Sequence, residues 1–403
     1  MDEKITLNLN DEASTNEKET NKWRFFLIGG LAGLVVGVGL ILISFLLPRA
    51  EKAALTFPII PSAEPTEQIY SPLSGEILTD PSQLNAPTYC IQTPNGTDGA
   101  RPQAGLNEAG VIFEAIAEAG ITRFAAIYQN PQSAAIGPIR SLRLYYLEWD
   151  TPFDCTIVHA GGADDALAAV RAGGYKDLTE NYAYMYRGTY SGRLWNNLFT
   201  TATDLRQFSA DKGYATSNVN GFDRMTPDEA TRNRIDNLVK EKLVITKPAA
   251  SNTSELSPQV SAINLYFGNV PAYNVSYTYD VTTNTYKRSY GNGKAHEVYA
   301  CPTENLGERN PEDICVLTQM GPKVVVAMVV SEKRASDNYH EDITAIGTGT
   351  VYIFQNGVAI KGTWNKASRS DQIKFFDENG NEVKLAPGQT FVSAVPNYGG
   401  VEY

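Results

Sequence analysis

Four arginines in the N-terminal half have the side chains best suited to bind a ligand in this sequence. The chain of 403 residues is acidic, with a formal net charge of −11, so each arginine stands out in its own string of sequence. A guanidinium group presents a planar fork of N–H donors that matches the two oxygens of a phosphate or carboxylate. The set therefore predicts an anion-binding cleft, with Ser141 between two of its members. The four are Arg101, Arg123, Arg140 and Arg143.

A structural role for the same arginines is the alternative. Guanidinium groups can pair with carboxylates of their own chain and lock the fold without binding a ligand. The sequence leaves both interpretations open. The carboxylates that could serve as internal partners are Glu114, Glu118, Glu148 and Asp150.

A catalytic role rests on fewer residues. His159 is expected at the end of a buried strand, before a Gly161-Gly162 turn where the next helix N-terminus could help to bind an anion. A histidine at a strand end can equally be structural. Glu114 with Glu118 could act as acid and base on a glycan if their carboxyl groups lay about 5 to 10 Å apart across a cleft. No G-x-S-x-G string marks a serine nucleophile, so a hydrolase using Glu114 or His159 is the second hypothesis.

The cysteines indicate disulfides rather than a metal site. There are four of them without a CxxC pair, and only three histidines accompany them, so we expect no zinc site and no cofactor. Three connectivities are open, and Cys301 with Cys315 is favoured because the polar loop NLGERNPED lies between them. Four buried free thiols are the alternative. The remaining two cysteines are Cys90 and Cys155.

An uncharged apolar run near the N-terminus predicts a membrane span. Residues 25–47 form a run of 23 residues, and a helix of this length crosses a hydrocarbon core of about 30 Å. More basic residues precede the run than closely follow it, so the positive-inside bias places residues 1–24 in the cytoplasm and exports the body. Cleavage after the run, at the alanines around residues 50–54, is the alternative.

The predicted span also bears on partners. Gly29, Gly33 and Gly37 lie four residues apart on one helix face, which would let two helices approach and form a homodimer. The alternative is that glycine is simply frequent in membrane spans. The negative net charge argues against nucleic acid, or an anionic membrane surface, as a partner of the whole body.

Composition divides the exported part into a spacer and two lobes. Residues 48–87 are rich in proline and polar residues and predict a semi-extended spacer. Residues 88–246 and residues 259–403 have globular composition, and the polar stretch 247–258 links them. We expect an α+β fold, a two-lobed layered sandwich with a mixed N-terminal lobe and a strand-rich C-terminal lobe, after one transmembrane helix.

The elements that must position the arginines are expected in the first lobe. Residues 111–117 and 122–128 favour two buried strands, although a helix followed by a strand has a similar pattern. Helices are expected at 139–149, 164–171, 203–212 and 227–243, and a buried strand at 155–158. In the second lobe, Asn356-Gly357 predicts a hairpin turn. Its expected strands are 262–267, 274–279, 286–290, 323–330, 349–355, 358–364, 372–376 and 390–395.

Several unusual strings now fall in one order along the chain. In the first lobe they are ARPQ at 100–103, GITRF at 120–124, IGPIRS at 136–141 and VHAGG at 158–162. In the second lobe they are IGTG at 346–349, FQNG at 354–357, GTW at 362–364 and PGQT at 387–390. Through these strings, over about residues 88 to 396, the chain resembles the YerB-like family of bacterial envelope lipoproteins.

The resemblance implies a layered α+β body to which both lobes contribute, and it implies no established activity. It also implies a lipid anchor, but no cysteine stands after the apolar run, so we expect the helix of residues 25–47 to be the tether. The resulting hypothesis is an extracytoplasmic protein of the cell membrane that binds an anionic cell-wall component or an envelope protein partner without catalysis. The alternative is a cell-wall hydrolase acting on peptidoglycan glycan or peptide.

Overall fold

The computed structural model describes residues 68–188, 196–240, 260–303 and 310–403. The chain divides into two compact units between Thr66 and Glu67, and all described residues belong to the second. The expected cytoplasmic tail, the apolar run 25–47 with its glycines, and the linker 247–258 lie outside the described residues. Among the residues that are described, no helix is long and apolar enough to cross a membrane.

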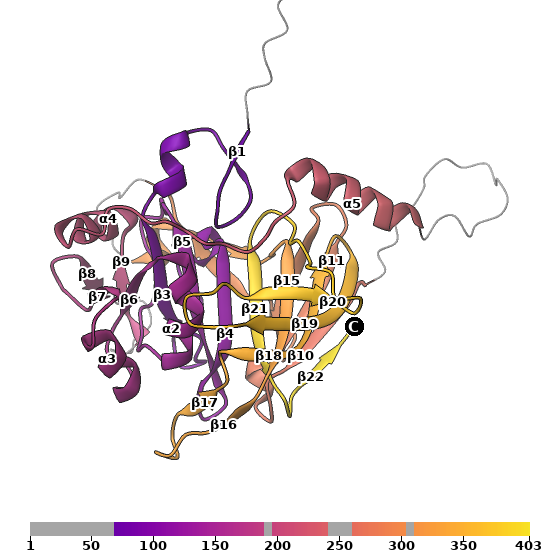
Figure 1. Cartoon of the computed structure of the whole chain (residues 1–403). Coiled ribbons are helices and arrows are strands. Elements are labelled where there is room, and N and C mark those ends of the chain that lie inside the picture. Colours follow the sequence, from indigo (N-terminus) through magenta and orange to yellow (C-terminus); the bar gives the residue numbers. More distant parts are fainter. Residues whose placement is uncertain (1–67, 189–195, 241–259, 304–309) are drawn as a thin grey trace, which may run out of the picture. The chain divides into compact units, whose positions relative to one another are not determined.

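A ten-stranded mixed sheet forms the centre of the body and takes strands from both halves of the sequence (Figure 1). Its central strand β21 pairs in parallel with β15 on one side and with β4 on the other, so the two halves share one hydrogen-bonded ladder. In order across the sheet the strands are β20 (Lys374–Asp377), β19 (Val358–Lys366), β18 (Gly347–Gln355), β15 (Val324–Val330), β21 (Thr390–Pro396), β4 (Val111–Glu118), β5 (Ile121–Gln129), β3 (Thr88–Pro94), β6 (Thr156–His159) and β7 (Lys176–Thr179).

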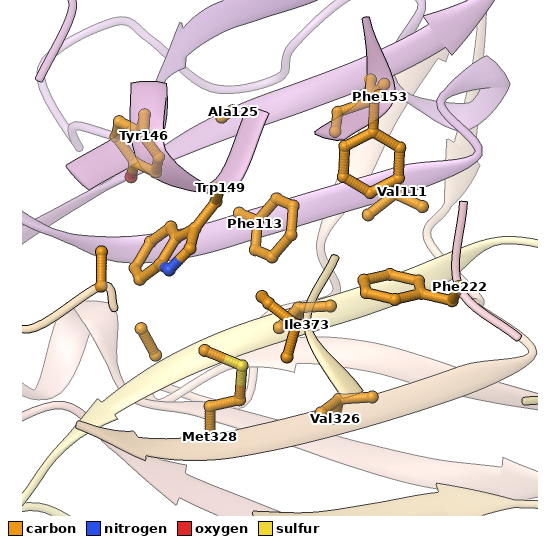
Figure 2. Close-up of a cluster of buried hydrophobic side chains, with 14 of the residues drawn as sticks. Val111, Phe113, Ala125, Tyr146, Trp149, Phe153, Phe222, Val326, Met328 and Ile373 are labelled. Carbon is orange, nitrogen blue, oxygen red and sulfur yellow. The ribbon is translucent and has the colours of Figure 1, made fainter. Parts of the chain in front are cut away.

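Alternate side chains of β15 show that both faces of this sheet are covered. Val326 and Met328 point into the main hydrophobic core with Trp149 and Ile373, as Figure 2 shows. Val325 and Ala327, which alternate with them along the strand, pack in a second core under a four-stranded sheet. A strand buried on both faces has a continuous apolar sequence, and β15 has this pattern, VVVAMVV. The four-stranded sheet consists of β12 (Thr285–Tyr290), β11 (Val275–Asp280), β10 (Ala262–Tyr266) and β22 (Gly400–Glu402).

Helices and two-stranded ribbons complete the body, and the expected α+β class is confirmed. The helices are α2 (Leu144–Asp150), α3 (Asp164–Arg171), α4 (Ala202–Asp211), α5 (Pro227–Lys240) and α6 (Pro311–Ile314). The ribbons are β1 (Ile69–Tyr70) with β2 (Ile77–Leu78), β8 (Met185–Arg187) with β9 (Leu198–Thr200), β13 (Glu297–Ala300) with β14 (Val316–Gln319), and β16 (Glu332–Arg334) with β17 (Glu341–Ile343).

Two expectations from the sequence are wrong. The helix expected at 139–149 begins only at Leu144, because the backbone N–H groups before it donate to other parts of the fold: Ile139 N–H to Leu198 O and Arg140 N–H to Gln92 O, both at 2.7 Å. The spacer does not extend to residue 87. Residues 68–87 fold onto the body, where Leu73 is 2% exposed in the main core and its carbonyl accepts from Arg224 Nε at 3.0 Å.

Both disulfides form, and the favoured pair is confirmed. Cys301 bonds to Cys315 across 14 residues, and Cys90 bonds to Cys155 across 65 residues, joining β3 to the start of β6. Disulfides persist in oxidising compartments and are rare in the cytosol. The pairing therefore agrees with a body that lies outside the cytoplasm.

Candidate functional site

The carboxyl ends of several strands that run in the same direction lie together at one end of the large sheet. Strands β3, β4 and β6 run in the same direction, because β3 pairs in parallel with β6 and both β3 and β4 are antiparallel to β5. Their carboxyl ends therefore lie at the edge where β5 begins. In open sheets with parallel strands, this edge is where ligands commonly bind. Glu118 ends β4 there, and Arg123 lies near the start of β5.

Two arginines hold the Glu118 carboxylate between them. Arg123 Nη2 donates to Glu118 Oε1 at 2.8 Å and to Oε2 at 3.1 Å, and Arg143 Nη2 donates to Oε2 at 2.5 Å. The arginine side chains are 4% and 6% exposed, so this is a buried cluster. Burial disfavours the ionised carboxyl, but the charges of Arg123 and Arg143 outweigh it and the pKa of Glu118 is lowered.

Arg140 is the third arginine of this cluster and the one without an internal partner. In the described part of the chain its guanidinium group makes no hydrogen bond and no ion pair, and its Nε is buried without a partner. The Nε atoms of Arg123 and Arg143 are orphaned in the same way. Burial lowers the pKa of Arg140, and burial together with repulsion from Arg143 lowers the pKa of Arg123 to about 10. Orphaned buried donors are unusual and suit a missing acceptor such as an anion.

A small pocket of about 240 Å³ opens against these arginines. Its lining includes Arg123, Arg140, Asp98, Asn196 and Tyr339. Asp98 is exposed and also acts on Arg140 by its charge. Three guanidinium groups face two carboxylates, Glu118 and Asp98, so the cluster keeps a formal surplus of one positive charge. We call this the arginine pocket.

A larger, separate groove has a volume of about 990 Å³. Arg143 lines it together with α2, the start of α3 and the β16–β17 hairpin. The hairpin is attached directly to the cluster, because Glu118 and His340 form an isolated antiparallel bridge. In Figure 1 the hairpin lies beyond the end of β4. The hairpin therefore borders both cavities, since Tyr339 lines the arginine pocket and His340 lines the groove.

The remaining arginine of the predicted set lies apart from this cluster. Arg101 donates to Asn95 Oδ1 at 2.9 Å and to the carbonyl oxygen of Ala272, and its guanidinium carbon stacks 3.7 Å from the ring centroid of Tyr290. It does not line the arginine pocket. Ser141, between the clustered arginines, donates its hydroxyl to Ala160 O, and its own carbonyl accepts from Arg123 Nη1 at 2.7 Å.

The two residues proposed for catalysis are buried and engaged inside the protein. Glu114 is fully buried and accepts two hydrogen bonds from Arg288 Nη2, at 2.9 and 3.0 Å, and one from Thr122. His159 is 2% exposed, and its ring nitrogens contact Gly161 O at 2.7 Å and Asp177 Oδ1 at 2.8 Å. Both arrangements are typical of structural side chains.

Arg288 and Tyr339 were not among the site residues predicted from the sequence. Arg288 joins Glu114 to His296, whose pKa is held well below its usual value by burial and by the Arg288 charge. Its signal was the alternation of β12, in which Tyr286, Arg288 and Tyr290 share the inward face. No comparable signal marks Tyr339, since it reaches the pocket from a hairpin far along the chain.

The comparisons with known proteins agree on a single family. Residues 73–215 match the N-terminal domain, and residues 263–392 the C-terminal domain, of the family described as protein of unknown function (DUF3048). The chain is 25% identical over 307 residues to a Bacillus subtilis (strain 168) protein named "Putative lipoprotein YerB", covering 75% of this chain and 80% of that protein. The crystal structure of the YerB protein from Bacillus subtilis has a similar fold, with a TM-score of 0.64 and 20% identity over 83% of this chain and all of that one.

Proposed function

The chain belongs to the DUF3048 family, and from that premise we propose that it is a membrane-anchored envelope protein whose exported body binds an anionic cell-wall component at the arginine pocket, without catalysis. The family has no described function, so the proposal rests on this chain's own residues. An envelope protein partner that presents a carboxylate or phosphate group would use the same chemistry.

Three observations support the anchored, exported placement. The run 25–47 has the length and composition of a membrane span, and the basic residues lie mostly before it. Both disulfides suit an oxidising compartment. A relative carries the name of a lipoprotein, a class of protein tethered to a membrane from outside. Pairing of two chains through Gly29, Gly33 and Gly37 stays a prediction.

The observation that carries the binding proposal is the state of Arg140. An arginine that has no partner among the described residues, beside two arginines that already share one carboxylate, costs free energy unless it gains a counter-charge. An anion supplied from outside would satisfy it with charge-assisted hydrogen bonds. Arg123 and Arg143 are then structural residues that hold the pocket open, and Arg140 is the residue that meets the ligand.

The test is co-sedimentation of the full-length protein, in detergent, with purified bacterial cell walls. Arg140→Ala should weaken binding at least tenfold and leave the unfolding midpoint unchanged, since it removes charge-assisted hydrogen bonds made only with the ligand. Arg171→Ala, at an exposed position outside the pocket, is the matched control and should bind like wild type. Arg143→Ala should instead lower stability, because it breaks the contact with Glu118.

Walls with and without their phosphate-containing polymers separate the two sources of anion. Loss of binding after these polymers are extracted would assign the phosphate groups, whereas unchanged binding would assign the carboxylates of peptidoglycan. Equal binding by wild type and Arg140→Ala would refute the proposal. Release of soluble wall fragments during the incubation would show that the absence of catalysis is wrong.

A further inference from the structure

An exposed tyrosine lines the arginine pocket. Tyr339 is 57% exposed and contributes to the lining that also contains Arg140. Large aromatic side chains are normally buried, and a half-exposed ring beside a charged pocket offers an apolar face to a ligand.

The tip of the β16–β17 hairpin holds this tyrosine in place. Asp337 Oδ1 accepts the backbone N–H groups of Tyr339 and His340, both at 2.9 Å, and Asp337 Oδ2 contacts the His340 ring at 2.5 Å. The hydrogen bond from the His340 N–H is the leading cause that lowers the pKa of Asp337 to about 2, so the carboxylate stays ionised. The bridge between His340 and Glu118 then ties the tip to the arginine cluster. The backbone that carries Tyr339 is therefore held at the pocket before any ligand arrives.

The size and lining of the pocket restrict what the ligand is. A volume of about 240 Å³ is more than a bare inorganic anion fills. Asp98 and Asn196 line the same space, where Asn196 Nδ2 donates to Asp98 Oδ1 at 3.1 Å, and polar groups of this kind suit hydroxyl and amide substituents. Few apolar side chains line it, which disfavours an apolar peptide side chain.

We propose that the arginine pocket binds a sugar unit that carries one anionic substituent, with the sugar ring on Tyr339 and the anionic group on Arg140. The inference rests on the proposed function and names its ligand class. The anionic substituent is a carboxylate or a phosphate, since a guanidinium group serves both.

The test is titration calorimetry of the full-length protein in detergent with four probes. N-acetylmuramic acid carries a carboxylate and N-acetylglucosamine 1-phosphate carries a phosphate, while N-acetylglucosamine has no charge and inorganic phosphate has no ring. We expect at least one anionic sugar to bind tenfold or more tightly than either the neutral sugar or inorganic phosphate. The tighter of the two anionic sugars identifies the substituent.

Substitutions at Tyr339 then distinguish recognition of the sugar ring from recognition of the anionic group. Tyr339→Ala should weaken the anionic sugar by roughly threefold to tenfold and leave inorganic phosphate unchanged, whereas Tyr339→Phe should bind like wild type. Tyr182→Ala, at a 62% exposed tyrosine outside the pocket, is the matched control and should change nothing.

The outcomes distinguish this inference from the proposed function. If Tyr339→Ala binds the anionic sugars as wild type does, or inorganic phosphate binds as tightly as they do, the sugar is not recognised and this inference fails while the anion site stands. If Arg140→Ala binds every probe as wild type does, the proposed function fails as well.

Discussion

Replacement of Glu118 by glutamine should convert the arginine cluster into a site that depends on an added anion for its stability. The change keeps the shape of the side chain but removes the only carboxylate among the described residues that bonds to Arg123 and Arg143, at 2.8 and 2.5 Å. Removing one partner of a buried ion pair costs about 3–5 kcal/mol because the other charge stays buried. Glu118 is 11% exposed and meets two arginines, so we expect a loss within that range.

The assay is urea unfolding of wild type and Glu118→Gln, with and without inorganic phosphate. Phosphate that binds the three arginines of the folded variant should restore about 2.7 kcal/mol when its concentration is 100 times the dissociation constant. Glu148→Gln is the matched control. Glu148 is also 11% exposed, but its arginine partner Arg369 is 45% exposed, so the cost should be about 1 kcal/mol or less. Phosphate should stabilise Glu148→Gln only as much as it stabilises wild type, because both keep Glu118.

Two results would refute this reasoning. If Glu118→Gln is as stable as wild type without phosphate, the Glu118 carboxylate is not needed to compensate the buried charges of Arg123 and Arg143. If phosphate stabilises Glu118→Gln no more than it stabilises Glu148→Gln, an added anion does not take the place of the Glu118 carboxylate between the arginines.

Three further changes test other parts of the structure. Glu114→Gln should cost about 3–5 kcal/mol in urea unfolding, because fully buried Arg288 loses its carboxylate partner, and a loss under about 1 kcal/mol would count against that pair. Burial raises the pKa of Glu332 to about 7 from 4.5, so its contribution to stability is present below pH 4.5 and is lost as the pH rises through 7. The difference in unfolding free energy between pH 4 and pH 8 should therefore change by roughly 3 kcal/mol in Glu332→Gln. The same difference in wild type and variant would contradict this prediction. Replacing Cys301 and Cys315 together by serine opens a 14-residue loop and should cost about 3 kcal/mol, whereas an unchanged unfolding midpoint would show that the bridge adds nothing.

The elements that could be predicted from the sequence are those fixed by local pattern. The apolar run 323–330 became β15, and Asn356-Gly357 became the turn between β18 and β19, since side-chain period and turn chemistry act over a few residues. The start of α2 was wrong because residues 139–142 bond to strand ends that are distant in the sequence. Such contacts depend on the order of strands in the sheet, which no local pattern specifies.

The candidate site shows the same division. Arginine chemistry correctly drew attention to Arg123, Arg140 and Arg143, which the structure brings together around Glu118, but the same reasoning included Arg101, which stacks on Tyr290. Sequence alone could not separate the paired arginines from the unpaired one, because pairing depends on which strand ends meet at one edge. The sequence alone could not identify Tyr339, since the β16–β17 hairpin follows β15 and lies at the pocket because of the position of β15 in the sheet.

The most direct test of the central claim is to locate an anion in the full-length protein by X-ray diffraction. Crystals grown with tungstate, a heavy tetrahedral oxyanion, would reveal its position by anomalous scattering. We predict an anomalous peak in the arginine pocket within hydrogen-bonding distance of the Arg140 guanidinium group, which disappears in Arg140→Ala crystals. A pocket without such a peak, with Arg140 instead paired to a carboxylate of its own chain, would contradict the account.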